Sequence, residues 1–412
     1  ANYWFGEWGI PLDGILGSII NAFANINTVA MGMTGLVVVL ASSYNYSNQL
    51  RANKTGDKCV PLVACIVSLV AYIATIPNAI DVGDSTITAF QINFFNYGEN
   101  IDDETIKEFE KKYNIKVNME TFDDMEAMYQ KINSGAGQYD VVLVSDALMP
   151  RMIEKGLVQE LNKENIPNIS QMDEQYLNLD MDPGNKYSVP YMFGTVGLIY
   201  NKDVVKEKVD SWDILWNEKY KDQIFMFDTY RDTIGVALKK LGYSLNSTNK
   251  DEINEAKELL LEQRKLINPI YGVDNGTTMI PAGETNINMI WSGEGLNLQD
   301  EYPNLVYIVP KEGANFWIDS LCITSNAKNV EGAEKFINFV SDKESALRIA
   351  DEIGYTTPNK EARLAQPKEI QDNPNAYMTK EIMSRCELYK DFDLKTKQMY
   401  DDAWTAIKID NN

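Results

Sequence analysis

The stretch that decides the fold of this chain is Asn315-Phe316-Trp317-Ile318-Asp319-Ser320-Leu321-Cys322-Ile323. Its apolar residues predict a buried strand, and the strand carries one charge, on Asp319. Side chains alternate across a strand, so Trp317 and Asp319 share a face, about 7 Å apart along the backbone. An indole ring beside a carboxylate suits a cation, because the ring face attracts the cation and the acid accepts charged hydrogen bonds from it. The alternative for this stretch alone is that Asp319 ends a strand at the surface.

Length and composition indicate a folded protein of two or three units. The chain has 412 residues, of which 44% are hydrophobic and 24% are charged, and this length exceeds that of an ordinary domain. The net charge is −22, and residues 1–80 contribute nothing to it, because three acidic residues there balance three basic ones. The negative charge therefore belongs to residues 81–412. It speaks against nucleic acid as a partner and suits a cationic ligand.

The sequence offers little to catalytic or metal chemistry. Histidine is absent, which removes His-based triads, general bases and metal sites. The cysteines, Cys59, Cys65, Cys322 and Cys386, show no C-x-x-C spacing, so neither a zinc site nor a disulfide framework is indicated. No phosphate-loop or complete dinucleotide-binding motif occurs. We therefore predict no cofactor, no metal and no enzymatic activity.

Two uncharged runs near the N-terminus predict transmembrane helices at residues 28–46 and 60–79, after an amphipathic helix over 10–27. The loop between the runs is basic, whereas their outer flanks are acidic, so the positive-inside rule places both ends outside the cytoplasm. We expect a membrane segment, residues 1–84, that holds residues 85–412 on the outer face of the cell membrane. The alternative is a pair of buried helices in a soluble domain.

From Gln91 onward, short strands alternate with helices. This alternation predicts an α/β domain with a mainly parallel sheet covered on both faces. Ligands of such sheets collect beyond the carboxyl ends of the strands, which here fall at 95–100 and 145–146. Residues 187–194 lead into a strand at 196–201, Ser211 is expected to cap a helix, and residues 353–358 form a rigid loop. The remaining expected strands are 92–95, 115–121, 141–145, 224–227, 287–291 and 306–309, and the expected helices are 102–112, 123–133, 147–155, 330–340 and 396–407.

A series of motifs, in the same order along the chain, resembles the periplasmic polyamine-binding proteins of ABC importers, the spermidine/putrescine type. The stretches that carry the resemblance are Tyr187-Ser188-Val189-Pro190-Tyr191, Ser211-Trp212-Asp213-Ile214-Leu215-Trp216, Leu241-Gly242-Tyr243-Ser244, Met289-Ile290-Trp291-Ser292-Gly293, Phe316-Trp317-Ile318-Asp319-Ser320-Leu321 and Ile353-Gly354-Tyr355-Thr356-Thr357-Pro358-Asn359. The resemblance implies the two-lobed periplasmic-binding-protein fold (type II), in which hinge closure traps a ligand. It implies one lobe at about 89–195 and 318–364, and the other at about 196–317 and 365–412, with the opening stretch at a hinge crossing.

The resemblance also implies a ligand site, and several of its positions carry the residue type of the family. Those that match are aromatic walls at Trp291, Trp317 and Tyr355, a central carboxylate at Asp319, end contacts at Glu99 and Ser145, and Asp232 where a glutamate is usual. Those that depart are Tyr97 for a tryptophan, Asn100 and Ala147 for tyrosines, Thr229 for an aspartate and Lys390 for a glutamine. Asp228 is expected to replace the missing acid in part. Taken alone, each aromatic residue also fits core packing, and Lys390 either points to solvent or marks a different ligand.

The function that this resemblance implies is capture of a small cationic amine, such as putrescine or spermidine, and its delivery to the permease and ATPase subunits of an ABC transporter. Residues 1–46 look like the last helices of a permease, and residues 60–79 like an added span that returns the chain to the outer face. The alternatives are a two-helix anchor without transport function, a membrane-tethered sensor with the same binding domain, and a remodelled pocket for another small ligand.

Overall fold

The computed structural model describes residues 90–98 and 100–409. They belong to a unit that comprises residues 88–412. The helices expected at 10–27, 28–46 and 60–79 lie outside the described residues. In the part of the chain that is described, no helix is long and apolar enough to cross a membrane.

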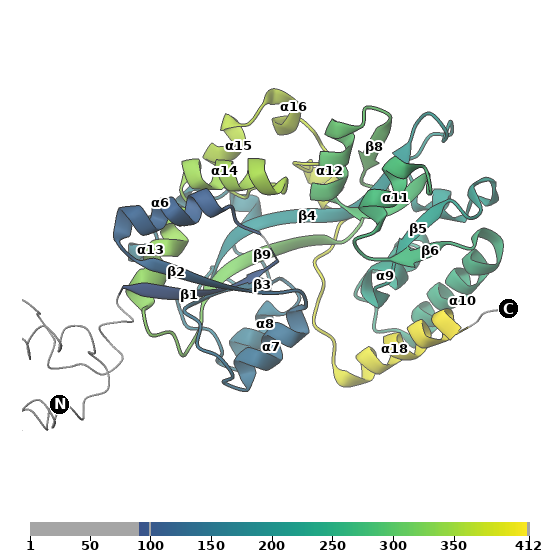
Figure 1. Ribbon diagram of the computed structural model, residues 1–412. Coiled ribbons are helices and arrows are strands. Elements are labelled where there is room, and N and C mark those ends of the chain that lie inside the picture. The colour runs from purple at the N-terminus through teal and green to yellow at the C-terminus, as the bar shows by residue number, and fades with distance from the viewer. Residues whose placement is uncertain (1–89, 99, 410–412) are drawn as a thin grey trace, which may run out of the picture. The chain divides into compact units, whose positions relative to one another are not determined.

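A nine-stranded sheet forms the centre of the described unit, in the order β2-β1-β3-β9-β4-β7-β5-β6, with β8 paired to β4. Two long strands, β4 (Ser188–Asn201) and β9 (Phe316–Ile323), run between two groups of elements (Figure 1). We call the group around β1–β3 the first lobe and the group around β5–β8 the second lobe. The lobe boundaries expected from the sequence remain predictions.

The first lobe has helices on both faces of its strands (Figure 1). Helix α6 shows how local sequence sets the ends of a helix. Asp102 caps its start by accepting a hydrogen bond from the Thr105 N–H, and Asn114 ends it in a left-handed conformation. The elements of this lobe are β1 (Gln91–Tyr97), α6 (Asp103–Tyr113), β2 (Lys116–Phe122), α7 (Met125–Asn133), β3 (Val141–Ser145), α8 (Met149–Glu154), α13 (Val330–Val340), α14 (Lys343–Ile353) and α15 (Lys360–Ala365), with 3₁₀ turns at Lys163–Asn165, Pro167–Gln171 and Glu174–Tyr176.

The second lobe places its longest helix, α10, against α9 and the last helix, α18. Its elements are β5 (Ile224–Phe227), α9 (Tyr230–Lys240), α10 (Lys250–Ile267), β6 (Ile270–Gly272), α11 (Gly276–Ala282), β7 (Ile287–Trp291), α12 (Ser292–Glu301), β8 (Leu305–Ile308) and α18 (Leu394–Ile409), with 3₁₀ turns at Trp212–Trp216 and Glu218–Tyr220. Two short helices, α16 (Lys368–Gln371) and α17 (Lys380–Met383), lie on the segment that returns from the first lobe to the second.

The prediction of a mainly parallel sheet is wrong. Among the described strands, β1 pairs with β2 and β3, and β5 with β6 and β7, in parallel, but β4 and β9 make antiparallel pairs with all their neighbours. The alternation of strands and helices holds within each lobe. It says nothing about the two strands that connect the lobes: β9 runs antiparallel to the first-lobe strand β3, and β4 runs antiparallel to the second-lobe strands β7 and β8.

Two local predictions also need correction. The strand expected at 196–201 is the second half of β4, a single 14-residue strand that begins at Ser188. Its burial does not alternate, since it is covered on both faces, and its register with β9 shifts between Pro190 and Met192. Ser211 does cap a helix, by accepting a hydrogen bond from Asp213 N–H, but this helix is a single 3₁₀ turn.

The hydrophobic cores follow the two lobes. One core contains residues from Val196 to Ala314 together with Phe392 and part of α18. Two further cores cover the opposite faces of the first-lobe sheet, one packed under α6 and α13 and one under α7 and α8. Each lobe therefore buries apolar residues of its own.

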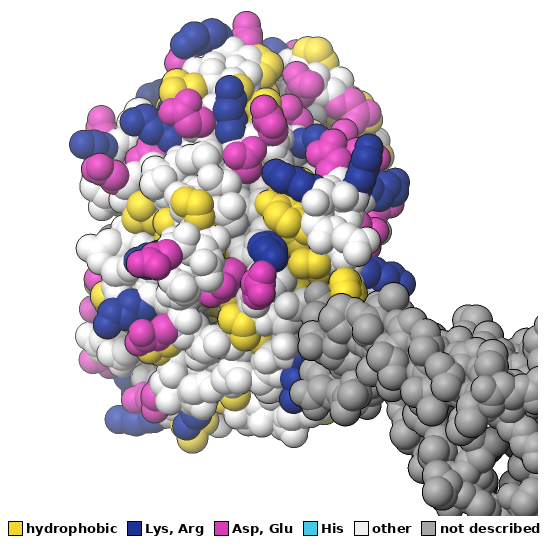
Figure 2. All heavy atoms as spheres, turned by 90° about the vertical axis from the view of Figure 1, so that its left-hand side faces the viewer, with side chains coloured by type: hydrophobic (Ala, Val, Ile, Leu, Met, Phe, Trp, Pro, Cys, Tyr) yellow, Lys and Arg dark blue, Asp and Glu magenta, His cyan; other side chains and the backbone are white. Residues whose placement is uncertain are grey.

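The surface of the first lobe mixes charges of both signs. Figure 2 looks onto the end of this lobe, and Lys and Arg side chains are interspersed there with Asp and Glu. On this face, the negative net charge is thus not gathered into one patch.

Candidate ligand-binding site

Strand β9 positions two of the predicted site residues, Trp317 and Asp319. It lies between β3 and β4, with Asp319 opposite Ser145 in β3 and opposite Met192 in β4. Asp319 is 6% exposed, and its carboxylate has no hydrogen-bond partner among the described residues. Burial raises the pKa of Asp319 to about 7, because a carboxylate away from water is costly.

Aromatic rings stand beside this carboxylate. The rings of Trp317 and Tyr355 meet edge to face, with centroids 5.1 Å apart and an interplanar angle of 76°. Gly194, opposite Trp317 in β4, makes room for the indole, since a Cβ atom there would lie 2.5 Å from Trp317 Cζ2. The charge of Asp319 contributes to the raised pKa of Tyr355, after the larger effects of burial and of Glu294. The aromatic pair and the acid therefore form one local environment.

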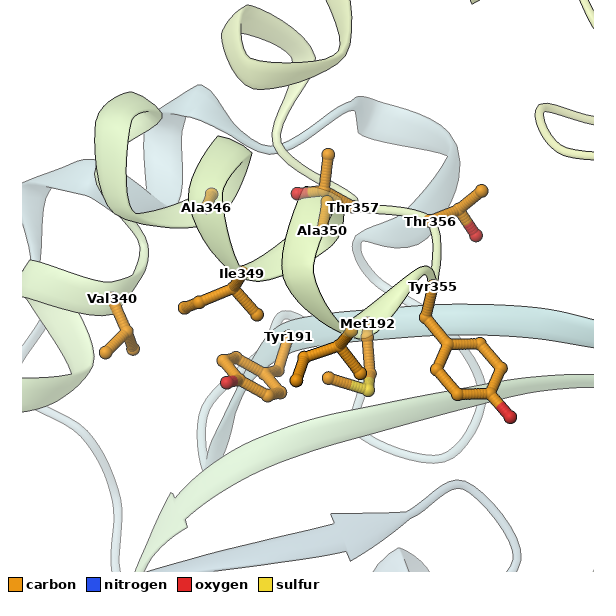
Figure 3. Close-up of a pocket in the computed structure, with 10 residues that line it drawn as sticks. Tyr191, Met192, Val340, Ala346, Ile349, Ala350, Tyr355, Thr356 and Thr357 are labelled. Atoms are coloured by element: carbon orange, nitrogen blue, oxygen red, sulfur yellow. The ribbon is translucent and has the colours of Figure 1, made fainter. Parts of the chain in front are cut away.

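Tyr355 belongs to the loop after α14. Gly354, with a φ of 80°, ends this helix directly before Tyr355. Figure 3 shows Tyr355 projecting from this loop at one end of a small cavity, with Ile349 and Val340 toward its other end. The cavity has a volume of about 10 Å³, close to the room that one water molecule takes. It is too small for an organic ligand.

The ends of β1 and β3 bring Tyr97 and Ser145 to the same edge as Asp319. Ser145 is the direct neighbour of Asp319 across the strand pair. Tyr97 packs edge to face on Phe122, with ring centroids 5.5 Å apart, and burial, followed by the charge of Asp319, raises its pKa. Glu99 lies outside the described residues. Apart from that position, the first-lobe residues of the predicted site come together.

A second buried acid, Asp146, follows Ser145 and was not among the predicted site residues. It is 3% exposed. Its Oδ1 accepts a hydrogen bond from Ile318 N–H at 3.4 Å, and its Oδ2 accepts one from Tyr389 N–H at 3.0 Å. Burial and the charge of Asp319 raise the pKa of Asp146 to about 8. Two carboxyl groups thus share this end of the sheet.

The second lobe supplies Glu294, another acid that the sequence reasoning missed. Glu294 lies in the first turn of α12 and has no ion pair or hydrogen bond of its side chain among the described residues. Burial and the charge of Asp274 raise its pKa to about 7. The start of α12 touches Tyr355, because a Cβ atom on Gly293 would lie 2.4 Å from Tyr355 Cδ1. The charges of Glu294 and Asp319 both raise the pKa of Tyr355, so the two carboxylates lie near the same aromatic ring.

Trp291 and Asp232 also lie in the second lobe. Trp291 ends β7 and stacks on Phe227, with ring centroids 4.4 Å apart. Asp232 accepts hydrogen bonds from the hydroxyl groups of Thr229 at 2.6 Å and Tyr389 at 2.9 Å. Burial raises the pKa of Asp232, and these two hydrogen bonds partly offset the effect.

Two other predicted residues are engaged elsewhere. Asp228 forms an ion pair with Lys408 at 2.8 Å, and its side chain is 39% exposed. Lys390 is exposed, and its backbone makes the contacts, with its N–H donating to Asn246 Oδ1 at 2.8 Å and its carbonyl accepting from Arg231 at 3.2 Å. In this segment the side chain that reaches an acid is that of the neighbouring Tyr389, which sequence reasoning also missed.

Four acids, two of them buried and two partly exposed, therefore lack a basic ion-pair partner among the described residues. They are Asp146, Asp232, Glu294 and Asp319, and each has a raised pKa. A carboxylate that is buried without a counter-charge is costly, so the arrangement favours a cation that enters from outside. In the described residues, no group of three or more acidic or cysteine side chains is placed to hold a metal ion.

Two lobes joined by crossing strands, with a charged and aromatic site at the crossing, define a solute-binding protein. The chain belongs to the family of bacterial extracellular solute-binding proteins, whose model matches residues 104–379. The family binds solutes rather than transforming them, in agreement with the prediction that the chain is not an enzyme, and it acts outside the cytoplasm.

Its relatives cover nearly the whole described unit. The spermidine/putrescine-binding periplasmic protein of Escherichia coli is 34% identical over 319 residues, which is 76% of this chain and 90% of that protein. The putrescine-binding periplasmic protein SpuD of Pseudomonas aeruginosa is 30% identical over 342 residues, which is 77% of this chain and 91% of that protein. The crystal structure of the spermidine/putrescine ABC transporter substrate-binding protein PotD of Streptococcus pneumoniae superposes with a TM-score of 0.73 at 35% identity, over 77% of this chain and 98% of that one. The periplasmic-binding-protein fold expected from the sequence is thus confirmed for the described residues.

Proposed function

We propose that this protein captures a small organic polycation, of the putrescine or spermidine class, outside the cytoplasm and delivers it to an ABC transporter. One observation carries the proposal: Asp319 is buried beside Trp317 and Tyr355, and no basic residue in the described part of the chain pairs with it. An amine supplies the missing charge, and the aromatic rings accept its ammonium groups and methylene chain. The names of the relatives support the same ligand class.

The proposed ligand contacts come from both lobes. Asp319, Trp317, Tyr355, Tyr97, Ser145 and Glu99 would line the ligand from the first lobe and the crossing strand, and Glu294, Trp291 and Asp232 from the second lobe, with Asp228 and Lys390 at the periphery. A cation–π contact contributes up to about 2 kcal/mol and a charged hydrogen bond about 1.5–3 kcal/mol. Two contacts of each kind give roughly 7–10 kcal/mol before association costs, against the roughly 8 kcal/mol that micromolar binding requires.

The membrane segment completes the proposal. The two uncharged runs at 28–46 and 60–79 would span the cell membrane and hold the binding unit on its outer face. The likeness of residues 1–46 to the last helices of a permease supports fusion of the binding unit to a permease. In that arrangement the captured amine never has to diffuse to its transporter.

Calorimetric titration of the full chain in detergent micelles tests the proposed ligand class. The panel comprises putrescine, cadaverine, spermidine and spermine, with choline and an uncharged amino acid as controls. Binding of at least one polyamine at micromolar or lower concentration is the expected result. If none of the four polyamines gives a measurable heat of binding, in protein whose thermal unfolding is cooperative, the proposed ligand class is excluded.

A further inference from the structure

The segment 387–391 runs between the lobes before α18 and is attached firmly to the second lobe. The side-chain amide of Asn246 donates to the carbonyl of Leu388 at 2.9 Å and accepts from the N–H of Lys390 at 2.8 Å. The guanidinium of Arg231 donates to the carbonyl of Lys390 at 3.2 Å. With the bond from Tyr389 to Asp232 described above, these contacts tie the segment to α9 and to the chain that follows it.

Fewer polar contacts join this segment to the core of the first lobe. One is the hydrogen bond from Tyr389 N–H to Asp146. Another is an ion pair in which Arg151 of α8 donates from Nε and Nη2 to the two oxygens of Asp391, at 2.7 and 2.6 Å. The Arg151 side chain is 16% exposed, so solvent screens this bidentate ion pair less than it screens an ion pair at the surface.

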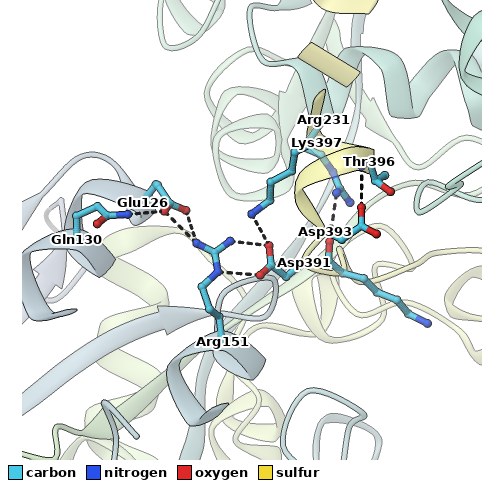
Figure 4. Close-up of polar contacts among 9 residues, drawn as sticks. Glu126, Gln130, Arg151, Arg231, Asp391, Asp393, Thr396 and Lys397 are labelled. Carbon is cyan, nitrogen blue, oxygen red and sulfur yellow. Dashed lines mark hydrogen bonds and ion pairs between the residues drawn. The ribbon is translucent and has the colours of Figure 1, made fainter. Parts of the chain in front are cut away.

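Each member of this pair also has a partner in its own lobe, as Figure 4 shows. Arg151 Nη1 donates to both oxygens of Glu126 in α7, at 2.9 and 2.7 Å. Asp391 receives a second ion pair from Lys397 in α18 at 2.8 Å. If the lobes part, Arg151 keeps Glu126 and Asp391 keeps Lys397. Neither charge is left alone, so separation does not incur the cost of an unpaired buried ion.

We propose that Arg151 is a positioning residue that acts as a latch between the lobes: its ion pair with Asp391 holds the segment 387–391 against the first lobe, and so slows the release of ligand. This inference rests on the proposed function for its ligand and on hinge motion for its mechanism. The latch touches no ligand. It acts through Tyr389, whose hydroxyl holds Asp232 on one side and whose N–H meets Asp146 on the other.

The test compares ligand release from Arg151→Gln, Asp391→Asn and the double variant, with putrescine and spermidine as probes in stopped-flow displacement. Each single variant is expected to raise the dissociation rate about tenfold, with the association rate changed less than about threefold, as is usual for interface contacts. The double variant should dissociate no faster than either single one, because both remove the same contact. Additive effects would overturn the latch.

Two further variants separate a latch from a general loss of stability. Arg348→Gln removes an arginine that is 30% exposed and whose partner, Glu108 at 2.9 Å, lies in the same lobe, and it is expected to leave the dissociation rate unchanged. Glu126→Gln removes the competitor for Arg151 but not the pair with Asp391, so it should not speed dissociation. Faster release from either variant, to the extent seen with Arg151→Gln, would overturn the proposal.

A distance measurement on the ligand-free protein tests the latch independently of which ligand the protein binds. Dyes attached at the exposed positions Lys111 in α6 and Glu258 in α10 report the distance between the lobes in single molecules. Arg151→Gln is expected to deplete the shorter-distance population of the ligand-free protein. Unchanged distances would contradict the latch. Failure of every polyamine to bind, together with the expected distance change, would contradict the proposed ligand and leave the latch standing.

Discussion

Two groups of charges lie where the lobes meet, and their electrostatics are opposite. Around Asp319, the buried Asp146 and Asp319 and the partly exposed Glu294 have no basic partner among the described residues, and their pKa values are raised. Around Asp391, the side chains of Arg151, Glu126 and Lys397 all take part in ion pairs. Burial alone would raise the pKa of Asp391, but hydrogen bonds from Arg151 and Lys397 hold it below its ordinary value.

The difference separates a site that awaits a partner from a cluster that already has one. Acids without a counter-charge make the ligand-free protein less stable. A cation that neutralises them removes this electrostatic cost, and the free energy regained contributes to its binding affinity. Balanced charges gain nothing from a ligand and can serve only to hold elements together. We therefore expect removal of an acid from the first group to lower ligand affinity without lowering stability, and removal of Lys397 from the second group to lower stability slightly and leave affinity nearly unchanged.

The largest effect is expected for Asp319→Asn. The change removes the central charge while keeping the size of the side chain, so polyamine affinity should fall about 100-fold or more, as for loss of a buried charged partner. The unfolding temperature of the ligand-free protein should stay the same or rise. Calorimetric titration and thermal unfolding measure the two quantities. Asp203→Asn, which changes an exposed acid, is the matched control, and equal losses in the two variants would remove Asp319 from the site.

Glu294→Gln is expected to have the next largest effect. Loss of one charged hydrogen bond of about 1.5–3 kcal/mol corresponds to a loss of affinity of about 10- to 100-fold. Titration with putrescine, and with a monoamine of similar length, shows whether the loss of affinity comes from a lost contact with the second ammonium group. If Glu294 pairs with a second ammonium group, the variant loses affinity for the diamine and little for the monoamine. A similar loss for both would place Glu294 outside the ligand contacts.

Affinity should depend on pH with a definite sign. The pKa values of Asp319 and Glu294 are raised to about 7, so both groups become neutral as the pH falls through 7 and attract a cation less. We expect a loss of affinity of about tenfold per group between pH 8 and pH 6. Titrations across this range in wild type and Asp319→Asn provide the check, and a flat wild-type profile would contradict the raised pKa values.

The same groups set how stability responds to pH without ligand. Between the pKa of the unfolded acids, about 4, and a folded pKa near 7, the folded state binds more protons, so its free energy of unfolding falls as the pH rises. The unfolding temperature of the ligand-free protein should therefore fall between pH 5 and pH 8. Saturating polyamine should restore it most at pH 8.

The smallest effect is expected in the balanced cluster, for Lys397→Met. Lys397 is 29% exposed and forms an ion pair with Asp391, which Arg151 also contacts. A pair of this exposure contributes at most about 1 kcal/mol, so unfolding in urea should shift by no more than that. Polyamine affinity should stay within about threefold of wild type. A loss of affinity as large as that of Glu294→Gln would erase the distinction between the two groups of charges.

Much of the fold could be predicted because its signals are local. The runs at 141–145, 224–227, 287–291 and 330–340 form the expected elements with the expected bounds. Within the opening stretch, one acid in an apolar strand pointed to Asp319, and the structure buries it as expected. The pairing of β4 and β9 against their neighbours had no local signal, since it depends on which lobe the chain enters next.

The missed site residues differ in how they could have been found. Asp146 directly follows the end of β3, where a ligand was expected, and Glu294 stands three residues after Trp291, so both lay within reach of the sequence argument. Tyr389 did not. Its partners Asp146 and Asp232 are 243 and 157 residues away in the chain, and no pattern in the sequence reports contacts of that span.

The position of β9 has a consequence for how the protein is made. In the first-lobe sheet it lies between β3 and β4, although both of these strands precede it by more than a hundred residues. Until residue 323 has left the ribosome, β3 and β4 have no partner on the sides that face each other, and Asp319 is not yet beside Ser145. Such long-range pairing folds slowly and exposes open strand edges meanwhile. The binding site therefore cannot form before most of the chain has been synthesised, and a nascent chain that stalls earlier offers two unpaired edges for aggregation.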